Sequence, residues 1–344
     1  MPRDVTSYNV YAQIQSQPAE LVRVLTADEP VAEAAAVIAG AGRVFTIGIG
    51  TAFNEALSGA WLLRAAGVDA NAWQSPDFVQ YGPGLRPTDA AIVFSHTGRK
   101  NMSRQALRVL AEAAVPSIWI AGTDTEENPA KVTLRTVPPE TAAPYTVSHT
   151  TAILLAARIA DAISPGSVGD LTAVPGAVAE ALTLEPAAQS LATAWKDIGA
   201  IVAVGAGPQE PSALEAGIKI DEAAWMRVRG YGVEYFLHGP QAQMQPGDAM
   251  IAYAAAGAGL ERTRAVAQFG LDIGAPVAWV SPETGPEGAE AFTLPDVGEQ
   301  LAPIVQVVAT QLLAVHLAAQ RDVDADKFRL DDPPFAKAFE RYDL

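Results

Sequence analysis

The sequence predicts an α/β protein with two doubly wound, flavodoxin-like parallel-sheet domains in tandem. Two observations predict this class. Short β-branched runs that end in Gly, Ser or Thr alternate with longer Ala/Leu-rich stretches, and the whole pattern occurs twice. Strands that alternate with helices form parallel βαβ units, whose ligands lie at the carboxyl ends of the strands. The repeat rests on four pairs of similar segments at offsets of 157 to 160: 43–52 with 200–209, 90–98 with 249–257, 115–122 with 275–282, and 154–160 with 312–318.

The elements follow in order from these patterns. Residues 1–40 are expected to form N-terminal helices, broken near Pro18 and Pro30. The first domain is expected over 41–165, the second over 191–322, and a linker that includes a helix over 166–190. In the first domain, strands are expected at 43–48, 91–95, 117–121 and 132–137, and helices at 52–66, 101–114 and 146–163.

The composition of the chain excludes several classes of partner and of functional site. The 344 residues carry a net charge of −16, which would repel a phosphate backbone, so no nucleic-acid partner is expected. The chain has no cysteine, which excludes disulfides, thiolate metal sites and cysteine nucleophiles. Ligand clusters at metal spacing are absent from the sequence, so no metal or cofactor is expected. No uncharged apolar run near 18 residues and no signal peptide is recognised, which favours a cytoplasmic protein without membrane contact.

Two loops of the first copy have the pattern of an anion site. Gly48-Ile49-Gly50 ends a strand and Thr51 opens a helix, which directs free N–H groups toward the space above the sheet. A lone G-x-G is weak evidence, and a tight turn capped by Thr51 would explain it equally well.

The second loop is "SHTGRKN" (95–101). Ser95 and Thr97 supply hydroxyl donors and Gly98 lets the backbone approach a ligand. The matching loop of the second copy, 254–257, keeps the glycine and has alanines in place of the hydroxyls, so a purely structural role would not explain Ser95 and Thr97. Arg99 and Lys100 follow. Each alone would be a solvated cation, but beside this loop in an acidic chain at least one is expected to face the anion.

The second copy carries different chemistry. Glu215, Lys219 and Glu222 share one helix face by spacing, either as a solvated salt-bridge stripe or, given the apolar neighbours, as a partly buried cluster. His238-Gly239-Pro240 then forms a rigid turn with one of only four histidines. These residues suit proton transfer.

The segments "GIGTA", "SHTG" and "LEAGIKIDE…FLHGP" resemble the sugar isomerase (SIS) domain family in its tandem form. That form occurs in the isomerase half of glucosamine-6-phosphate synthase and in related isomerases, deaminases and deglycases. The resemblance covers about residues 20–340. It implies a homodimer, and a C-terminal tail (323–344) that closes over the site.

The resemblance also implies roles for individual residues. The sugar's C6 phosphate would bind the loops with Gly50, Thr51, Ser95, His96 and Thr97. Glu222, with Lys219 beside it, would move a proton between C1 and C2. His238 would assist ring opening in the neighbouring subunit. The remaining matches are Glu140 and Thr146 beside the site and Lys337 as the closing lysine.

The chain also departs from the family pattern. Ala52 and Lys100 stand where the family has a serine and a threonine, and Tyr235 stands where it often has a glutamate. The expected activity is aldose–ketose isomerisation of a hexose or amino-hexose 6-phosphate through a cis-enediol. The alternatives are a 6-sulfo sugar such as sulfoquinovose, deamination or deglycation of an amino-sugar phosphate, and a non-catalytic sugar-phosphate-binding regulator. Without cysteine or a glutaminase domain, glutamine-dependent amidotransfer is not expected.

Overall fold

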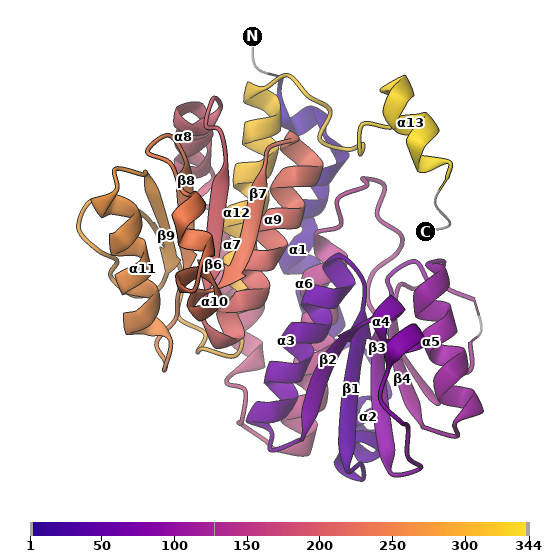
Figure 1. The fold of residues 1–344 in the computed structure, drawn as a ribbon. Coiled ribbons are helices and arrows are strands. Elements are labelled where there is room, and N and C mark those ends of the chain that lie inside the picture. The colour runs from indigo at the N-terminus through magenta and orange to yellow at the C-terminus, as the bar shows by residue number, and fades with distance from the viewer. Residues whose placement is uncertain (1–2, 127, 342–344) are drawn as a thin grey trace. The chain divides into compact units, whose positions relative to one another are not determined.

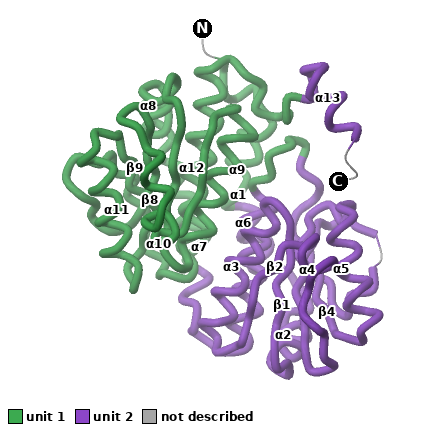
Figure 2. The backbone as a smooth tube through the Cα atoms, viewed as in Figure 1, with its two compact units in different colours: residues 1–18, 141–146, 173–329 green, residues 19–140, 147–172, 330–344 purple. Residues whose placement is uncertain are grey.

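The computed structural model describes residues 3–126 and 128–341, and the chain divides into two compact units. Unit 1 comprises residues 1–18, 141–146 and 173–329, and unit 2 comprises 19–140, 147–172 and 330–344 (Figure 2). Each repeat of the sequence supplies the sheet of one unit. Helix α1 (Asn9–Thr26) contributes residues to both.

Unit 2 contains a five-stranded parallel sheet in the order β2-β1-β3-β4-β5 (Figure 1). β3 and β4 are buried along their whole length, as expected for a sheet covered on both faces. The strands are β1 (Arg43–Gly48), β2 (Ala70–Gln74), β3 (Asp89–Phe94), β4 (Ser117–Ala121) and β5 (Val132–Arg135). The helices are α2 (Val31–Ala39), α3 (Thr51–Ala65), α4 (Ser75–Tyr81), α5 (Asn101–Glu112), α6 (Val147–Ile163) and α13 (Pro333–Phe339).

Unit 1 repeats the same topology, with a parallel sheet in the order β10-β9-β8-β6-β7. Read from the first strand of each repeat, both orders are 2-1-3-4-5, so the predicted tandem doubly wound fold is confirmed. The strands are β6 (Ile201–Gly205), β7 (Val228–Gly232), β8 (Ala249–Tyr253), β9 (Val277–Ser281) and β10 (Glu290–Thr293). The helices are α7 (Val174–Leu182), α8 (Glu185–Trp195), α9 (Glu210–Ala224), α10 (Val233–Leu237), α11 (Leu260–Asp272) and α12 (Ala302–Gln320).

Short 3-10 turns complete the described chain: η1 (Val5–Ser7), η2 (Leu171–Ala173), η3 (Gly207–Gln209) and η4 (Pro240–Gln243). The segment 166–190, predicted as a linker, holds η2, α7 and the first part of α8. Both helices pack against α12 inside unit 1.

Two sequence-based expectations about helices are wrong. α1 continues through Pro18, because the side chain of Gln17 donates a hydrogen bond to the Ile14 carbonyl (3.1 Å), which has lost its usual N–H donor. α12 is long and apolar enough to cross a membrane, although no such run was recognised in the sequence. Every residue of its most apolar window is buried inside the protein, so its composition reflects the core of unit 1.

Candidate functional site

In unit 2 the chain leaves the adjacent strands β1 and β3 toward opposite sides of the sheet, because the strand order reverses between them. Such a switch point leaves a crevice beyond the carboxyl ends of the strands. Gly50 precedes α3 with φ of 60°, and Gly98 turns the β3 loop with φ of 63°. The structure therefore brings the two predicted anion loops, around Thr51 and Ser95, to neighbouring strand ends.

Ser95 lies at the end of β3 and is 4% exposed. Its hydroxyl finds no hydrogen-bond partner among the residues that the structure describes. A buried polar group left unsatisfied costs about 1–3 kcal/mol, which a bound ligand would recover. Thr97 is half-buried two residues later, and its hydroxyl accepts a hydrogen bond from the Arg99 N–H (3.3 Å).

His96 is buried beside Glu140. The Glu140 N–H donates to the His96 Nε2 atom (3.4 Å), and burial lowers the pKa of His96 although the nearby Glu140 carboxylate opposes this shift. The Glu140 carboxylate also accepts hydrogen bonds from the backbone of Val147 (3.3 Å) and Ser148 (2.9 Å). Glu140 therefore caps the first turn of α6 and links it to the β3 loop.

Arg99 and Lys100 are both exposed. Lys100 is the N-cap residue of α5 and makes no side-chain capping bond. Arg99 lines a cavity with other arginines of unit 2. The predicted cations thus flank the loop that carries Ser95, while the buried part of the loop offers hydroxyls.

The corresponding loop of unit 1 shows that this loop geometry accommodates a carboxylate. Gly257 corresponds to Gly98, and the carboxylate of Glu299 lies against it, 2.1 Å from where a Cβ atom would stand. The same carboxylate accepts a hydrogen bond from the Ala258 backbone N–H, while burial raises the pKa of Glu299. In unit 1 the chain thus places its own anion at the loop that corresponds to the hydroxyl-bearing loop of unit 2.

Unit 1 holds the predicted proton-transfer cluster on α9. Glu215 and Lys219 are buried, with exposures of 0% and 2%, which excludes the solvated-stripe interpretation. The Lys219 Nζ atom lies 2.5 Å from Glu222 Oε2 and 3.6 Å from Glu215 Oε1. Burial raises the pKa of Glu222, and the neighbouring Lys219 ammonium partly opposes this shift. One lysine therefore holds a carboxylate of raised pKa in place.

The environment of Glu215 is a part of the site that the sequence reasoning missed. Tyr253, the last residue of β8, is buried close enough to Glu215 for that charge to raise its pKa, although desolvation is the larger cause. Its hydroxyl bonds the hydroxyl of Thr310 on α12. Tyr253 and Thr310 lie in apolar stretches whose pattern predicts a hydrophobic core. Only their hydroxyl groups indicate in the sequence that they could belong to a polar cluster.

The remaining predicted residues are His238, Thr146 and Lys337. The side chain of His238 is 78% exposed at the end of α10, with Nε2 at 3.6 Å from Glu234. Thr146 is buried in unit 1, whereas Lys337 is exposed on α13 in unit 2. Within unit 1, Lys219 and Glu222 are brought together. Within unit 2, Gly50, Thr51, Ser95, His96 and Thr97 are assembled with Glu140.

The two parallel sheets with flanking helices match the tandem SIS fold of phosphosugar isomerases. No family model matches the chain. A glutamine–fructose-6-phosphate aminotransferase [isomerizing] from Aeropyrum pernix is 29% identical over 92% of this chain and 55% of its own length. Its counterpart from Methanothermobacter thermautotrophicus is 24% identical over the same shares. The chain thus spans about half the length of the curated relatives it matches.

Solved structures share the fold. The C-terminal domain of glucosamine-fructose-6-phosphate aminotransferase from Francisella tularensis superposes with a TM-score of 0.85 at 18% identity, covering 93% of this chain and 98% of that one. Tagatose-6-phosphate ketose/aldose isomerase from Escherichia coli gives 0.79 at 15% identity, covering 95% and 97%. These matches confirm the predicted resemblance to the SIS isomerase domain.

Proposed function

We propose that the protein interconverts an aldose and a ketose that carry an anionic group at C6, most simply a hexose or amino-hexose 6-phosphate. The observation that carries the proposal is the pair of the buried Lys219 and the half-buried Glu222, a base of raised pKa held by a fixed ammonium. The names of the relatives, which act on fructose 6-phosphate and tagatose 6-phosphate, support this substrate class.

In the proposed mechanism, the Glu222 carboxylate takes the C2 proton of the open-chain aldose and leaves a cis-enediolate, the ionised form of the cis-enediol, with its negative charge on O1. It then returns a proton to C1 while the proton on O2 moves to O1, which yields the ketose. One carboxylate serves both carbons because they are adjacent. Lys219 fixes the carboxylate, and the hydroxyls of Ser95 and Thr97 position the far end of the sugar. No step requires a metal.

Ring opening needs an acid or base at O5, and we assign it to His238. Its side chain is largely exposed on its own chain, which suits a residue that completes the site of a second copy in a homodimer. Lys337, exposed on α13, is the proposed closing lysine of the tail.

A 6-sulfo sugar is the second candidate, and one observation favours it. The β3 loop buries few hydroxyl donors, while Arg99 and Lys100 stand exposed directly after it. A sulfonate carries a single negative charge. A loop with few hydroxyl donors and a cationic rim would suffice to bind a sulfonate. A phosphate dianion would bind more tightly with every additional hydroxyl donor.

The test follows proton exchange in D2O by NMR, at C2 of each aldose and at C1 of each ketose. Glucose 6-phosphate, fructose 6-phosphate, glucosamine 6-phosphate, a fructosamine 6-phosphate and sulfoquinovose are compared, with ammonia release measured in parallel. Exchange with a 6-phosphate supports the main proposal, and exchange with sulfoquinovose alone supports the second. Binding without exchange for every sugar would identify a non-catalytic binding protein and refute both.

A further inference from the structure

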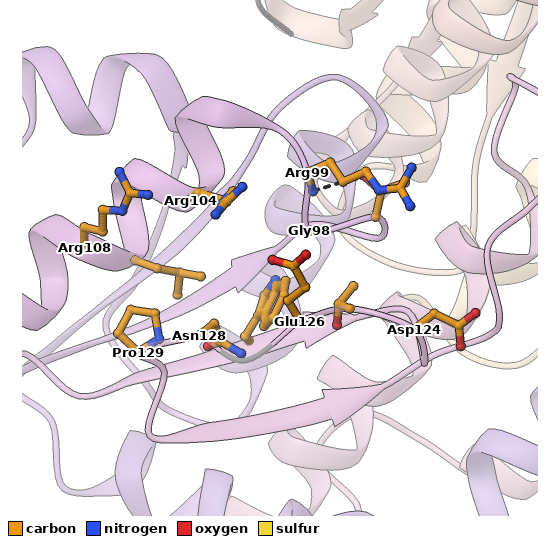
Figure 3. Close-up of a pocket in the computed structure, with 12 residues that line it drawn as sticks. Gly98, Arg99, Arg104, Arg108, Asp124, Glu126, Asn128 and Pro129 are labelled. Carbon is orange, nitrogen blue, oxygen red and sulfur yellow. Dashed lines mark hydrogen bonds between the residues drawn. The ribbon is translucent and has the colours of Figure 1, made fainter.

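A second feature of unit 2 lies beside the candidate anion loop. The cavity has a volume of about 270 Å³ and lies between α5 and the loop that follows β4 (Figure 3). Arg99, Arg104 and Arg108 line one wall, and Asp124 and Glu126 lie along the opposite one. Its size is near the lower end of the range for small-molecule sites.

The arginine wall is unusual because none of its guanidinium groups is paired with a carboxylate among the described residues. Arg104 and Arg108 are one helical turn apart on α5, and Arg99 stands two residues before the helix. None of the three forms an ion pair with any carboxylate in the described part of the chain. Like charges at this helical spacing repel each other, so an anion bound between them would relieve that repulsion.

The indole of Trp119 lines the same cavity. Trp119 lies in β4 and is 3% exposed, and its N–H has no hydrogen-bond partner among the described residues. Buried indole N–H groups usually find an acceptor. The cavity therefore combines unneutralised cations with an unsatisfied buried donor.

The sequence repeat provides an internal control at an offset of 160. Trp279 corresponds to Trp119, and its N–H donates to the Glu283 carbonyl (2.6 Å). Arg264 corresponds to Arg104 and donates to the Thr284 carbonyl (2.9 Å). Gln268 replaces Arg108. The second copy thus satisfies both donors with its own loop. It keeps only one of the three cations, since Gly259 stands at the position of Arg99, so the fold does not require the open arrangement of the first copy.

We propose that this cavity binds a small phosphorylated polyol or similar phosphate ester, with its phosphate on Arg104 and Arg108 and with Arg99 at the rim. Guanidinium groups match phosphate oxygens in pairs, and the carboxylates of Asp124 and Glu126 on the facing wall accept hydrogen bonds from ligand hydroxyls. Thr97 and Gly98 also line the cavity. The cavity therefore shares residues with the loop that carries Ser95, and a role as an effector site rests on the proposed function.

The test is isothermal titration calorimetry with glycerol 1-phosphate, which has a phosphate and two hydroxyls but no carbonyl to isomerise. Compared with wild type, R108Q is expected to weaken binding about tenfold and R104Q/R108Q to abolish it. The matched control R262Q removes an exposed arginine of unit 1 and is expected to bind like wild type. Because α5 exposes both arginines, unchanged melting temperatures establish that the variants fold.

Two results would overturn the proposal. Equal affinity in all four proteins would show that the arginines do not bind phosphate. Loss of binding in S95A, with R104Q/R108Q unaffected, would place glycerol 1-phosphate in the candidate substrate loop instead. The calorimetric result does not depend on turnover, so failure of the isomerase proposal and failure of this one are distinguishable.

Discussion

Lys219 is shared between two carboxylates, and this arrangement makes the role of Glu222 testable. Replacing Glu222 with glutamine keeps its size and a hydrogen-bond acceptor for Lys219 but removes the base. We expect E222Q to lose about 10²–10⁴-fold in kcat while thermal-shift binding of the sugar is retained. D221N is the matched control, since the neighbouring Asp221 accepts a hydrogen bond from the Val228 N–H and makes no ion pair with Lys219 among the described contacts. An E222Q enzyme with wild-type turnover would exclude Glu222 as the base.

Glu222 is also expected to set the lower pH limit of activity. Burial raises the pKa of Glu222 above its ordinary value of 4.5, and only the ionised form can accept a proton. Activity is therefore expected to fall on acidification at a pH above the normal carboxylate range. A pH profile of kcat/KM checks this. If kcat/KM fell only at or below pH 4.5, Glu222 would not be a base whose pKa is raised by desolvation.

At this scale the sequence predicted which side chains of α9 lie together better than it predicted what surrounds them. Spacing alone placed Glu215, Lys219 and Glu222 on one helix face, because helical periodicity is local. It could not decide between a solvated stripe and a buried cluster, since burial depends on what packs against the face. The sequence also could not show that the side chains of Arg104 and Trp119 lack polar partners among the described residues, because this depends on the path of the loop that follows β4.

At the scale of elements, two glycines with similar φ angles provide a matched pair. At Gly98 (φ 63°) an added Cβ atom would stand 2.7 Å from the Trp119 ring, whereas at Gly50 (φ 60°) it would meet nothing within 4 Å. Both changes to alanine carry a backbone cost of about 1–3 kcal/mol. We expect G98A to lower the free energy of unfolding further than G50A, as measured by urea denaturation. Equal losses would show that the loop moves away from Trp119 without cost.

The continuous helix α1 depends on one buried side chain. Gln17 donates to the Ile14 carbonyl and, at 2.8 Å, to Gln311 Oε1 of α12. Replacing it with alanine leaves buried acceptors unpaired, and Q17A is expected to lose about 1–3 kcal/mol of stability. Q15A, on the exposed side of the same helix, is the control. Similar melting temperatures for both variants would refute this role for Gln17.

The elements that the sequence predicted best are the fully buried ones. β1 and β4 were placed with their observed bounds, because a parallel strand covered on both faces is a continuous apolar run. β2 was not predicted, since "ANAWQ" is half-exposed at the sheet edge and lacks such a run. The break expected at Pro18 failed because a side chain replaced the lost backbone donor.

For the whole molecule, stability is expected to depend on pH through His316. This buried histidine of α12 bonds Glu185 at 3.1 Å, and desolvation lowers its pKa below 6.5 despite the carboxylate. The folded state therefore binds the proton less well than the unfolded state. Its contribution to stability is present above 6.5 and is lost as the pH falls through the folded-state pKa.

Urea denaturation of wild type and H316Q, at a pH above and a pH below that range, measures this effect. H316Q should lose less stability than wild type on acidification. His96, whose pKa is also lowered by burial, would account for part of the remaining slope. An identical slope in both proteins would show that His316 is not responsible.

The proposed homodimer predicts complementation between copies. E222Q and H238A, each inactive alone, should regain part of the activity when mixed, because one mixed site would contain both wild-type residues. Analytical ultracentrifugation establishes the assembly in parallel. No recovery from a confirmed mixed dimer would mean that Glu222 and His238 act within one chain.

The division of the chain has a consequence for any attempt to separate its two units. The backbone passes between the two units five times, and α1 belongs to both. Unit 2 also includes the segment from Leu330 onward, which follows the last segment of unit 1 in the sequence. A fragment cut at the boundary of the repeat would therefore leave each unit without a segment that belongs to it in the folded protein.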